Sequence, residues 1–360
     1  MNRELETKLN RVRNMITEKD LDALYIKGQD NFAWLTCGGR NYAGLGAVGN
    51  CGLLVTKDKT YAITNNIEAP RMIDEEHLEN LGFKVTYGAW YDSSFENRTL
   101  SSLVPSVKIG YDTSDCSKDV QLLRFDLVEE EIERYKKIGE DASLAMEEAG
   151  MAIDLGMSEY EVAASIMAKM EEKGLEVVSC MVAADERISK YRHALPTEKI
   201  IEGRVQFGGN FRRSGLVISL TRFVWFYEPT EEERKQYRDN QIIDCTYMAT
   251  SKPGATFVSA LEKGKAKYEE LGYAGEFEKH HQGGPIGYQG RDYKVDFNTP
   301  GVIADHQGFC WNPTITGTKS EDTVVSTKEG IIPITKPILF PKTVIEVEGM
   351  VFERPDILVK

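Results

Sequence analysis

The sequence predicts an α+β protein with two domains. The first is an α/β domain over residues 1–125, and the second, over residues 126–360, has a curved antiparallel sheet with helices packed on one side. A chain of 360 residues is long enough for two ordinary cores. Residues 1–125 alternate between short helical and strand patterns, which is typical of layered α/β domains. Near Asp126 the pattern changes to helix, helix, strands, helix, helix, strands.

The first domain is expected to begin with an amphipathic helix and to continue with short apolar strands. Apolar runs bounded by polar turn residues indicate these strands, and Lys57-Asp58-Lys59 marks the turn of a hairpin. The expected elements are a helix over Arg3–Lys19, a strand over Ala23–Ile26, a hairpin of Gly52–Val55 with Tyr61–Thr64, and a strand over Val107–Tyr111.

The second domain is expected to open with a long amphipathic helix over Val128–Gly150, with Gly150 as a plausible C-cap. Ser158 followed by Glu161 is a capping box that predicts the start of the next helix, which Gly174 ends. The later expected elements are strands over Val177–Ala184 and Val205–Phe226, the latter turning at Arg212–Gly215, and helices over Thr230–Met248 and Thr256–Leu271.

Composition excludes several classes of partner. The formal net charge of -13 argues against a nucleic acid or an anionic membrane, since both require a basic surface. The charged N-terminus has no apolar signal-peptide segment, and no apolar run approaches the roughly 20 residues that span a bilayer. The six cysteines are scattered without C-x-x-C spacing, which favours a reducing cytoplasm and gives no zinc-knuckle signal.

Two histidine-containing segments could carry chemistry. His193 lies between predicted strands, and His280 and His281 open the run HHQGGPIGYQG, in which four of the positions from Gly283 to Gly290 are glycine. Such a run either lets backbone approach a ligand closely or forms a tight structural loop, and both interpretations remain open. No Gly-Lys-Ser/Thr follows it, so it is not a phosphate loop, and no G-x-S-x-G predicts a serine triad.

Several motifs resemble the creatinase/aminopeptidase family, which is the peptidase M24-like family with the pita-bread fold. They are His193, Ser219-Leu220-Thr221-Arg222, HHQGGPIGY, Trp311-Asn312-Pro313, Ser320-Glu321-Asp322-Thr323 and, in the first domain, Asn31–Thr36. The resemblance covers essentially the whole chain. It implies a creatinase-like N-terminal domain, a pita-bread catalytic-type domain and a homodimer. The family includes Xaa-Pro aminopeptidases, prolidases, methionine aminopeptidases and creatinase.

The family's peptidases bind two metal ions through two Asp, one His and two Glu, a ligand set suited to Mn, Co, Zn or Fe. By resemblance, the five ligand positions fall at Gly208, Ser219, Pro285, Asn312 and Glu321. Only Glu321 can bind a metal as a carboxylate. The segment from Gln206 to Arg222 contains no acidic residue, so a shift of one position restores no ligand there. We therefore expect no functional dinuclear metallopeptidase and no cofactor.

Creatinase is a branch of the family that works without metal. It hydrolyses a guanidino acid with a histidine as acid/base and carboxylates that hold the guanidinium. The resemblance places that histidine at His193 and one carboxylate at Glu321, whereas Thr221 replaces the other. It places an anion-binding arginine, which reaches the neighbouring subunit's site, at Arg40 in Gly39-Arg40-Asn41-Tyr42-Ala43-Gly44.

The favoured hypothesis is a metal-independent hydrolase or lyase that cleaves a C–N bond in a small polar molecule, with or without a carboxylate group. His193 and Glu321 are the expected catalytic residues, and the expected substrate-binding residues are Arg40, Thr221, His281 and Tyr288. Which of His280 and His281 faces the pocket remains open, and Arg222 is expected to be structural. The alternatives are a metal-dependent Xaa-Pro dipeptidase or aminopeptidase, and a non-catalytic binding module on the peptidase scaffold.

Overall fold

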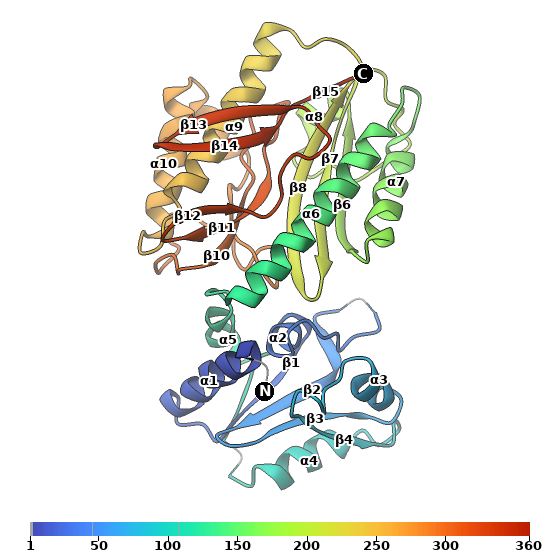
Figure 1. The fold of residues 1–360 in the computed structure, drawn as a ribbon, viewed down its shortest axis with the longest axis vertical. Coiled ribbons are helices and arrows are strands. Elements are labelled where there is room, and N and C mark those ends of the chain that lie inside the picture. Colours follow the sequence, from blue (N-terminus) through green and yellow to red (C-terminus); the bar gives the residue numbers. More distant parts are fainter. Residues whose placement is uncertain (1–2, 45, 107) are drawn as a thin grey trace. The chain divides into compact units, whose positions relative to one another are not determined.

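The structure, a computed structural model, describes residues 3–44, 46–106 and 108–360. It divides into two compact units, Met1–Phe125 and Asp126–Lys360 (Figure 1). The division falls at the residue where the sequence pattern changes. Val107, the first residue of one predicted strand, lies outside the described residues.

Unit 1 is built on a mixed five-stranded sheet with the order β4-β3-β2-β1-β5. The pairs β1–β2 and β2–β3 are antiparallel, whereas β1–β5 and β3–β4 are parallel. Both predicted halves of the hairpin are present and are longer than expected. The elements of this unit are α1 (Arg3–Glu18), β1 (Ala23–Gly28), α2 (Gln29–Leu35), β2 (Val48–Thr56), β3 (Thr60–Asn65), α3 (Ala69–Asp74), β4 (Lys84–Gly88), α4 (Phe95–Leu103), β5 (Ile109–Tyr111) and α5 (Ser117–Leu123).

Unit 2 holds two four-stranded sheets and a separate hairpin, so the single curved sheet expected from the sequence is divided. The sheet orders are β15-β8-β7-β6 and β12-β11-β10-β9, and β13 pairs with β14. The elements are α6 (Glu129–Met151), α7 (Glu159–Glu172), β6 (Glu176–Ala184), α8 (Glu186–Lys190), β7 (Arg204–Arg213), β8 (Leu216–Trp225), α9 (Glu231–Thr250), α10 (Phe257–Glu270), the 3-10 helix η1 (Ala274–Lys279), β9 (Gly283–Pro285), β10 (Gln307–Trp311), β11 (Asp322–Thr327), β12 (Gly330–Pro333), β13 (Lys342–Val347), β14 (Met350–Pro355) and β15 (Leu358–Val359).

The predicted turn between the two long strands is a two-residue loop. Ser214 and Gly215 both have positive φ, 51° and 76°, the combination required by a type I′ turn. This turn fixes the register of β7 against β8, which pairs Gly208 with Thr221 and Asn210 with Ser219. Paired residues point to the same face of a sheet, and so do residues two apart along one strand. All four positions therefore share one face.

The helix ends confirm one capping prediction and correct another. Ser158 and Glu161 form the predicted capping box, with the Ser158 amide donating to the Glu161 carboxylate at 2.7 Å. Gly150, however, is not a C-cap, because α6 continues to Met151. A Cβ at Gly150 would lie 2.6 Å from the Phe340 ring and 2.8 Å from the Phe207 ring. This glycine is thus required by close packing.

A chain of buried ion pairs joins α6, β8, β11, α9 and β14. Arg222 is fully buried and lies 2.9 Å from Glu147 and 3.1 Å from Asp322. Asp322 also pairs with Arg354 at 3.2 Å, and Arg354 with Asp244 at 2.5 Å. The Glu147 carboxylate additionally accepts the backbone N–H groups of residues 338–340. Arg222 is therefore structural, as expected from the sequence.

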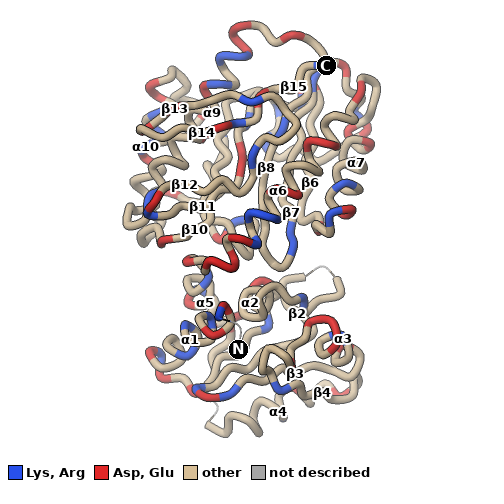
Figure 2. Tube along the Cα trace, viewed as in Figure 1, with Lys and Arg blue, Asp and Glu red and all other residues tan. Residues whose placement is uncertain are grey.

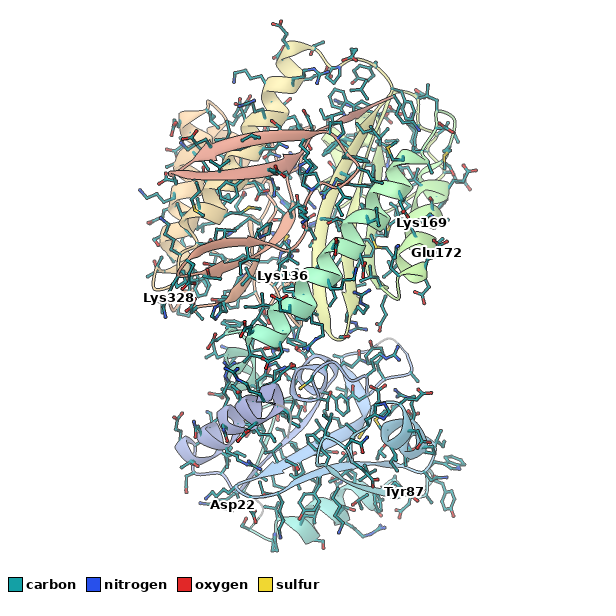
Figure 3. All side chains as sticks on the ribbon, in the orientation of Figure 1. Asp22, Tyr87, Lys136, Lys169, Glu172 and Lys328 are labelled. Atoms are coloured by element: carbon teal, nitrogen blue, oxygen red, sulfur yellow. The ribbon has the colours of Figure 1, made fainter. Side chains whose placement is uncertain are left out.

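Acidic and basic residues are interspersed along both units (Figure 2), and exposed helix faces carry ion pairs such as Lys169 with Glu172 on α7 (Figure 3), 3.1 Å apart. Such exposed pairs contribute little to stability. Among the described residues, none of the helices is both long enough and apolar enough to cross a membrane.

Replacing Glu147 with Ala should leave the buried Arg222 with Asp322 as its remaining counter-charge and should leave three backbone donors without an acceptor. We expect the free energy of unfolding to fall by about 3–5 kcal/mol, the usual cost of breaking a buried ion pair. Glu133→Ala on the same helix removes an exposed carboxylate paired with Lys136, and should cost less than about 1 kcal/mol. Urea unfolding of both variants measures the difference, and equal losses would contradict the role assigned to the buried network.

Candidate functional site

The candidate site is centred on the carboxylate of Glu321, which lies just before β11 and is 3% exposed. Its Oε1 accepts from Ser219 Oγ and Arg291 Nη2, both at 3.0 Å. Its Oε2 accepts from Thr221 Oγ1 and lies 2.7 Å from the ammonium of Lys319. Four donors thus occupy the roughly four lone-pair positions that a carboxylate offers.

Strand β8 holds two of these donors in place through contacts with the segment around β11. The Thr221 amide donates to the Glu321 carbonyl at 3.1 Å. The Ser219 amide donates to Thr323 Oγ1 at 2.8 Å, and that hydroxyl donates back to the Ser219 carbonyl at 2.9 Å. The shared face of β7 and β8 is therefore fixed against Glu321.

Lys319 and Arg291 place two cations beside this carboxylate. The side chain of Lys319 is 3% exposed and that of Arg291 is 14% exposed. Burial by itself raises the pKa of Glu321, but the Lys319 ammonium and the Arg291 guanidinium outweigh it and lower the pKa to about 2. Glu321 is therefore ionised near neutral pH and is a poor proton acceptor.

Three imidazoles form a cluster whose protonation is affected by the same charges. The ring centroids of His193, His280 and His281 lie 4.3–5.5 Å apart, and Nε2 of His193 is 3.1 Å from Nε2 of His280. Burial, followed by Lys319, lowers the pKa of His193 and brings that of His280 to about 2. Burial, Lys294 and Arg291 bring the pKa of His281 to about 3. All three rings are neutral at pH 7.

A single acidic residue, Glu276 of η1, holds the loops that carry the cluster. Its Oε2 accepts from the backbone and hydroxyl of Thr316 at 2.8 and 2.7 Å, and lies 3.5 Å from Arg192. Arg192 also donates to the Thr316 hydroxyl at 2.7 Å. His193 adjoins Arg192, and His280 follows η1, so these contacts bring segments distant in sequence together.

The residues present do not fit the dinuclear metal centre implied by the resemblance. A Cβ at Gly208 would lie 2.4 Å from the Leu220 carbonyl oxygen, so this backbone has no room for any side chain there. Pro285 pairs with Phe309, whose ring belongs to the core around α9 and α10. Asn312 is buried, with its Oδ1 unpartnered. The hydroxyl of Ser219 is a donor to Glu321, and that glutamate is already saturated by two protein cations.

The imidazole cluster has the spacing of a site for a single metal ion. Ring nitrogens of the three histidines lie within 4.8 Å of one another, close enough for one ion. Three imidazoles are a known zinc ligand set. However, Lys319, Lys294 and Arg291 are among the charges acting most strongly on these rings, and they oppose a second cation. The spacing permits a metal, but the electrostatics disfavour it.

The other predicted substrate-binding residues lie in different surroundings. Tyr288 is buried, and its hydroxyl donates to Glu131 of α6 at 2.6 Å, so it is engaged with that helix. Arg40, in unit 1, has an exposed side chain 3.8 Å from Glu76, and its amide donates to the same carboxylate at 2.8 Å. His280 and His281 both lie in the imidazole cluster, so the structure does not select one of them over the other.

Lys319 and Arg291 were missed by reasoning from the sequence. The available signals were a lysine two residues before a motif glutamate and an arginine directly after the glycine-rich run. Both are ordinarily surface residues, and only tertiary structure shows that each becomes buried against Glu321.

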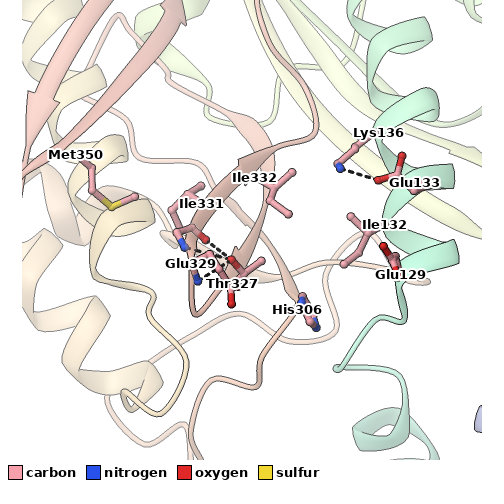
Figure 4. Close-up of a pocket in the computed structure, with 11 residues that line it drawn as sticks. Glu129, Ile132, Glu133, Lys136, His306, Thr327, Glu329, Ile331, Ile332 and Met350 are labelled. Carbon is pink, nitrogen blue, oxygen red and sulfur yellow. Dashed lines mark hydrogen bonds and ion pairs between the residues drawn. The ribbon is translucent and has the colours of Figure 1, made fainter.

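A separate cavity of about 630 Å³ lies in unit 2 beside the start of α6 (Figure 4). None of the predicted catalytic residues lines it. Its lining residues are Glu129, Ile132, Glu133, Lys136, His306, Thr327, Glu329, Gly330, Ile331, Ile332 and Met350. Its wall mixes charged groups with isoleucines, without the convergent donors that surround Glu321.

The lowered histidine pKa values predict a loss of stability in acid. An unfolded imidazole takes up a proton near pH 6.5, whereas His280 and His281 do so only near pH 2 and 3. Their contribution is therefore complete above pH 6.5 and is lost as the pH falls below it, by at most about 1.4 kcal/mol per pH unit for each ring. The His280→Gln/His281→Gln variant should show a shallower decline between pH 6.5 and 4 in urea unfolding. The exposed His77→Gln should keep the full slope, and an unchanged slope in the double variant would contradict the prediction.

The sequence is similar to a family of metallopeptidases and to individual Xaa-Pro dipeptidases. Residues 133–329 match the model of metallopeptidase family M24. The Xaa-Pro dipeptidase of Lactobacillus delbrueckii subsp. lactis is 26% identical over 250 residues, which cover 66% of this chain and 66%, just under two thirds, of that relative. The Xaa-Pro dipeptidase of Pyrococcus furiosus is 22% identical over 357 residues, covering 92% of this chain and 98% of the relative.

Solved structures show the same fold. The Xaa-Pro dipeptidase from Bacillus anthracis superposes with a TM-score of 0.73 at 21% identity, covering 92% of this chain and 98% of the other. The N-terminal domain of FACT complex subunit SPT16 from Cicer arietinum has a TM-score of 0.69 at 10% identity, covering 93% and 97%. These likenesses show the pita-bread architecture alone. Because the matched family region spans more than half of the 360 residues, the chain belongs to metallopeptidase family M24.

Proposed function

We propose that the chain is a metal-independent hydrolase or lyase that cleaves a C–N bond in a small, polar, carboxylate-bearing molecule. The observation that carries this proposal is the saturation of Glu321, the one carboxylate among the five ligand positions expected from the resemblance, by Lys319 and Arg291. Gly208 and Ser219 supply no carboxylate to compete for them. Cys51, Cys116, Cys180, Cys245 and Cys310 are free thiols, which supports a reducing, cytoplasmic location.

The neutral imidazoles provide the proton transfer. His193 is the most exposed of the three, and its ring lies 3.1 Å from His280, so one ring can orient the other. In a hydrolysis, His193 accepts a proton from water as the oxygen attacks the carbon, and returns it to the leaving nitrogen. Glu321 has its lone pairs engaged, so its role is to position Lys319 and Arg291.

An Xaa-Pro dipeptidase is the second candidate, favoured by the names of the relatives. This activity would require bound metal ions. Of the five expected ligand positions, four hold neither a carboxylate nor an imidazole. A non-catalytic binding module is the third candidate. It is favoured only by the likeness to the SPT16 domain, which at 10% identity concerns the fold.

Replacing His193 with Ala should lower turnover about 10²- to 10⁴-fold, the usual contribution of a general acid/base. The measurement is the release of ammonia, urea or free amine from a panel of amide, ureido and guanidino acids, with chelator-treated full-length protein. His306→Asn is the matched control, because His306 lies in the separate cavity and has a φ of 55° that asparagine tolerates.

The panel also separates the candidates. Unchanged turnover by His193→Ala would exclude its catalytic role. Cleavage of Xaa-Pro dipeptides only after manganese is added, with about two bound equivalents, would establish the second candidate. No turnover in any assay would favour the binding module.

We also infer that the protein is a homodimer in which Arg40 reaches the neighbouring subunit's site. The exposed guanidinium of Arg40, whose backbone is fixed by Glu76, supports this assignment. Arg40→Ala and His193→Ala should each be nearly inactive. Mixed and re-associated, they should recover about a quarter of the normal activity, since half of the dimers then hold one intact site. No recovery, in a mixture shown to exchange subunits, would place Arg40 in its own subunit's site or outside any site.

A further inference from the structure

The polar groups around Glu321 have more donors than acceptors. Lys319 has three N–H groups, of which one is directed at Glu321. Arg291 donates to Glu321 and to the Gly290 carbonyl, which leaves other N–H groups of its fork. Glu321 has no accepting position left, because four donors already fill it. A ligand that enters this site therefore meets donors that lack an acceptor.

Unsatisfied imidazole nitrogens lie beside these donors. The Nδ1 atoms of His280 and His281 are buried and have no hydrogen-bond partner. A buried polar atom without a partner costs about 1–3 kcal/mol, so such atoms are retained where a ligand or a water completes them. His193 is the exposed member of the cluster, while Glu321 and Lys319 are almost fully buried. Exposure thus falls from the neutral ring of His193 to the charged groups of Lys319 and Glu321.

The sign of the charge selects the ligand. Besides burial, Lys319, Arg291 and Lys294 lower the pKa values of the imidazoles, and the carboxylate of Glu321 opposes them at His193 and His280. This local excess of cations contrasts with the formal charge of -13 for the whole chain. Charges in a buried site interact far more strongly than those on the surface. A cation is repelled from this site, whereas an anion gains both charge and hydrogen bonds.

We propose that Lys319 and Arg291, with the neighbouring imidazoles, form a binding site for the carboxylate group of a small organic acid. Glu321 serves as an internal counter-anion, and the ligand's carboxylate binds beside it to the same two cations. The planar carboxylate of Glu321 already fits between the ammonium and the guanidinium, which favours a carboxylate over a tetrahedral oxyanion. This inference deepens the proposed function by assigning the residues that recognise the substrate's charge.

Equilibrium binding tests the proposal without any need for turnover. The probes for titration calorimetry on the full-length protein are N-acetylglycine, its neutral amide N-acetylglycinamide, inorganic phosphate and manganese ion. We expect N-acetylglycine to bind at least tenfold more tightly than the other three. Equal binding of acid and amide, tighter binding of phosphate, or tighter binding of manganese would each overturn the assignment.

Variants of the charged groups are expected to change the affinity for N-acetylglycine in opposite directions. Glu321→Gln keeps the shape but removes the counter-anion, so N-acetylglycine should bind about tenfold more tightly. A gain in affinity cannot arise from misfolding. Lys319→Met should weaken binding at least tenfold, whereas Lys328→Met, which removes a lysine 72% exposed on the surface (Figure 3), should leave it unchanged. Weaker or unchanged binding by Glu321→Gln would overturn the proposal.

The outcome is separable from that of the proposed function. Binding of N-acetylglycine without turnover of any panel compound would support the carboxylate site and refute the hydrolase. Turnover abolished by His193→Ala, together with indifference to the charge of the probe, would support the hydrolase and refute the site.

Discussion

The arrangement of the site depends on one interaction, the clamp of the Glu321 carboxylate between Lys319 and Arg291. The glutamate alone would be costly to bury, and so would each cation. Together they are compensated, and the hydroxyls of Ser219 and Thr221 complete the carboxylate. The clamp ties β8 to the segment before β11 and to the glycine-rich loop. Its charged groups also act on the three histidines, so the clamp affects both the arrangement and the charge of the candidate site.

The clamp explains how a member of metallopeptidase family M24 can keep Glu321 buried without the ligand set that the resemblance implies. In the peptidases, as the resemblance implies, acidic side chains surround two positive ions. Here the positive charges belong to the chain, and a single acid balances them. The relatives' names point to dipeptide hydrolysis, whereas the residues point to a site of opposite charge preference. Family membership and site chemistry therefore carry different information in this protein.

Much of the fold could be predicted from the sequence, because helix periodicity, capping residues and turn residues are local signals. The Ser158–Glu161 box and the Ser214–Gly215 turn are examples. The division of the second sheet could not be predicted, since it depends on pairing between distant strands. Gly150 was misassigned because a glycine required by packing and a glycine at a helix end look alike in sequence. Likewise, His193 and the lack of acids near Ser219 were visible, whereas the burial of Lys319 and Arg291 was not.

The ion pairs around Arg222 have a consequence for how this fold changes over time. They join α6, β8, β11, α9 and β14 through side chains other than those that contact the Glu321 carboxylate. Asp322, the first residue of β11, points to Arg222, whereas Glu321 just before it points to Lys319, so two adjacent residues belong to different sets of ion pairs. In a scaffold with this division, the residues around Glu321 can be substituted one at a time while the ion pairs around Arg222 keep the fold stable. The same architecture occurs in an Xaa-Pro dipeptidase and in the N-terminal domain of FACT complex subunit SPT16.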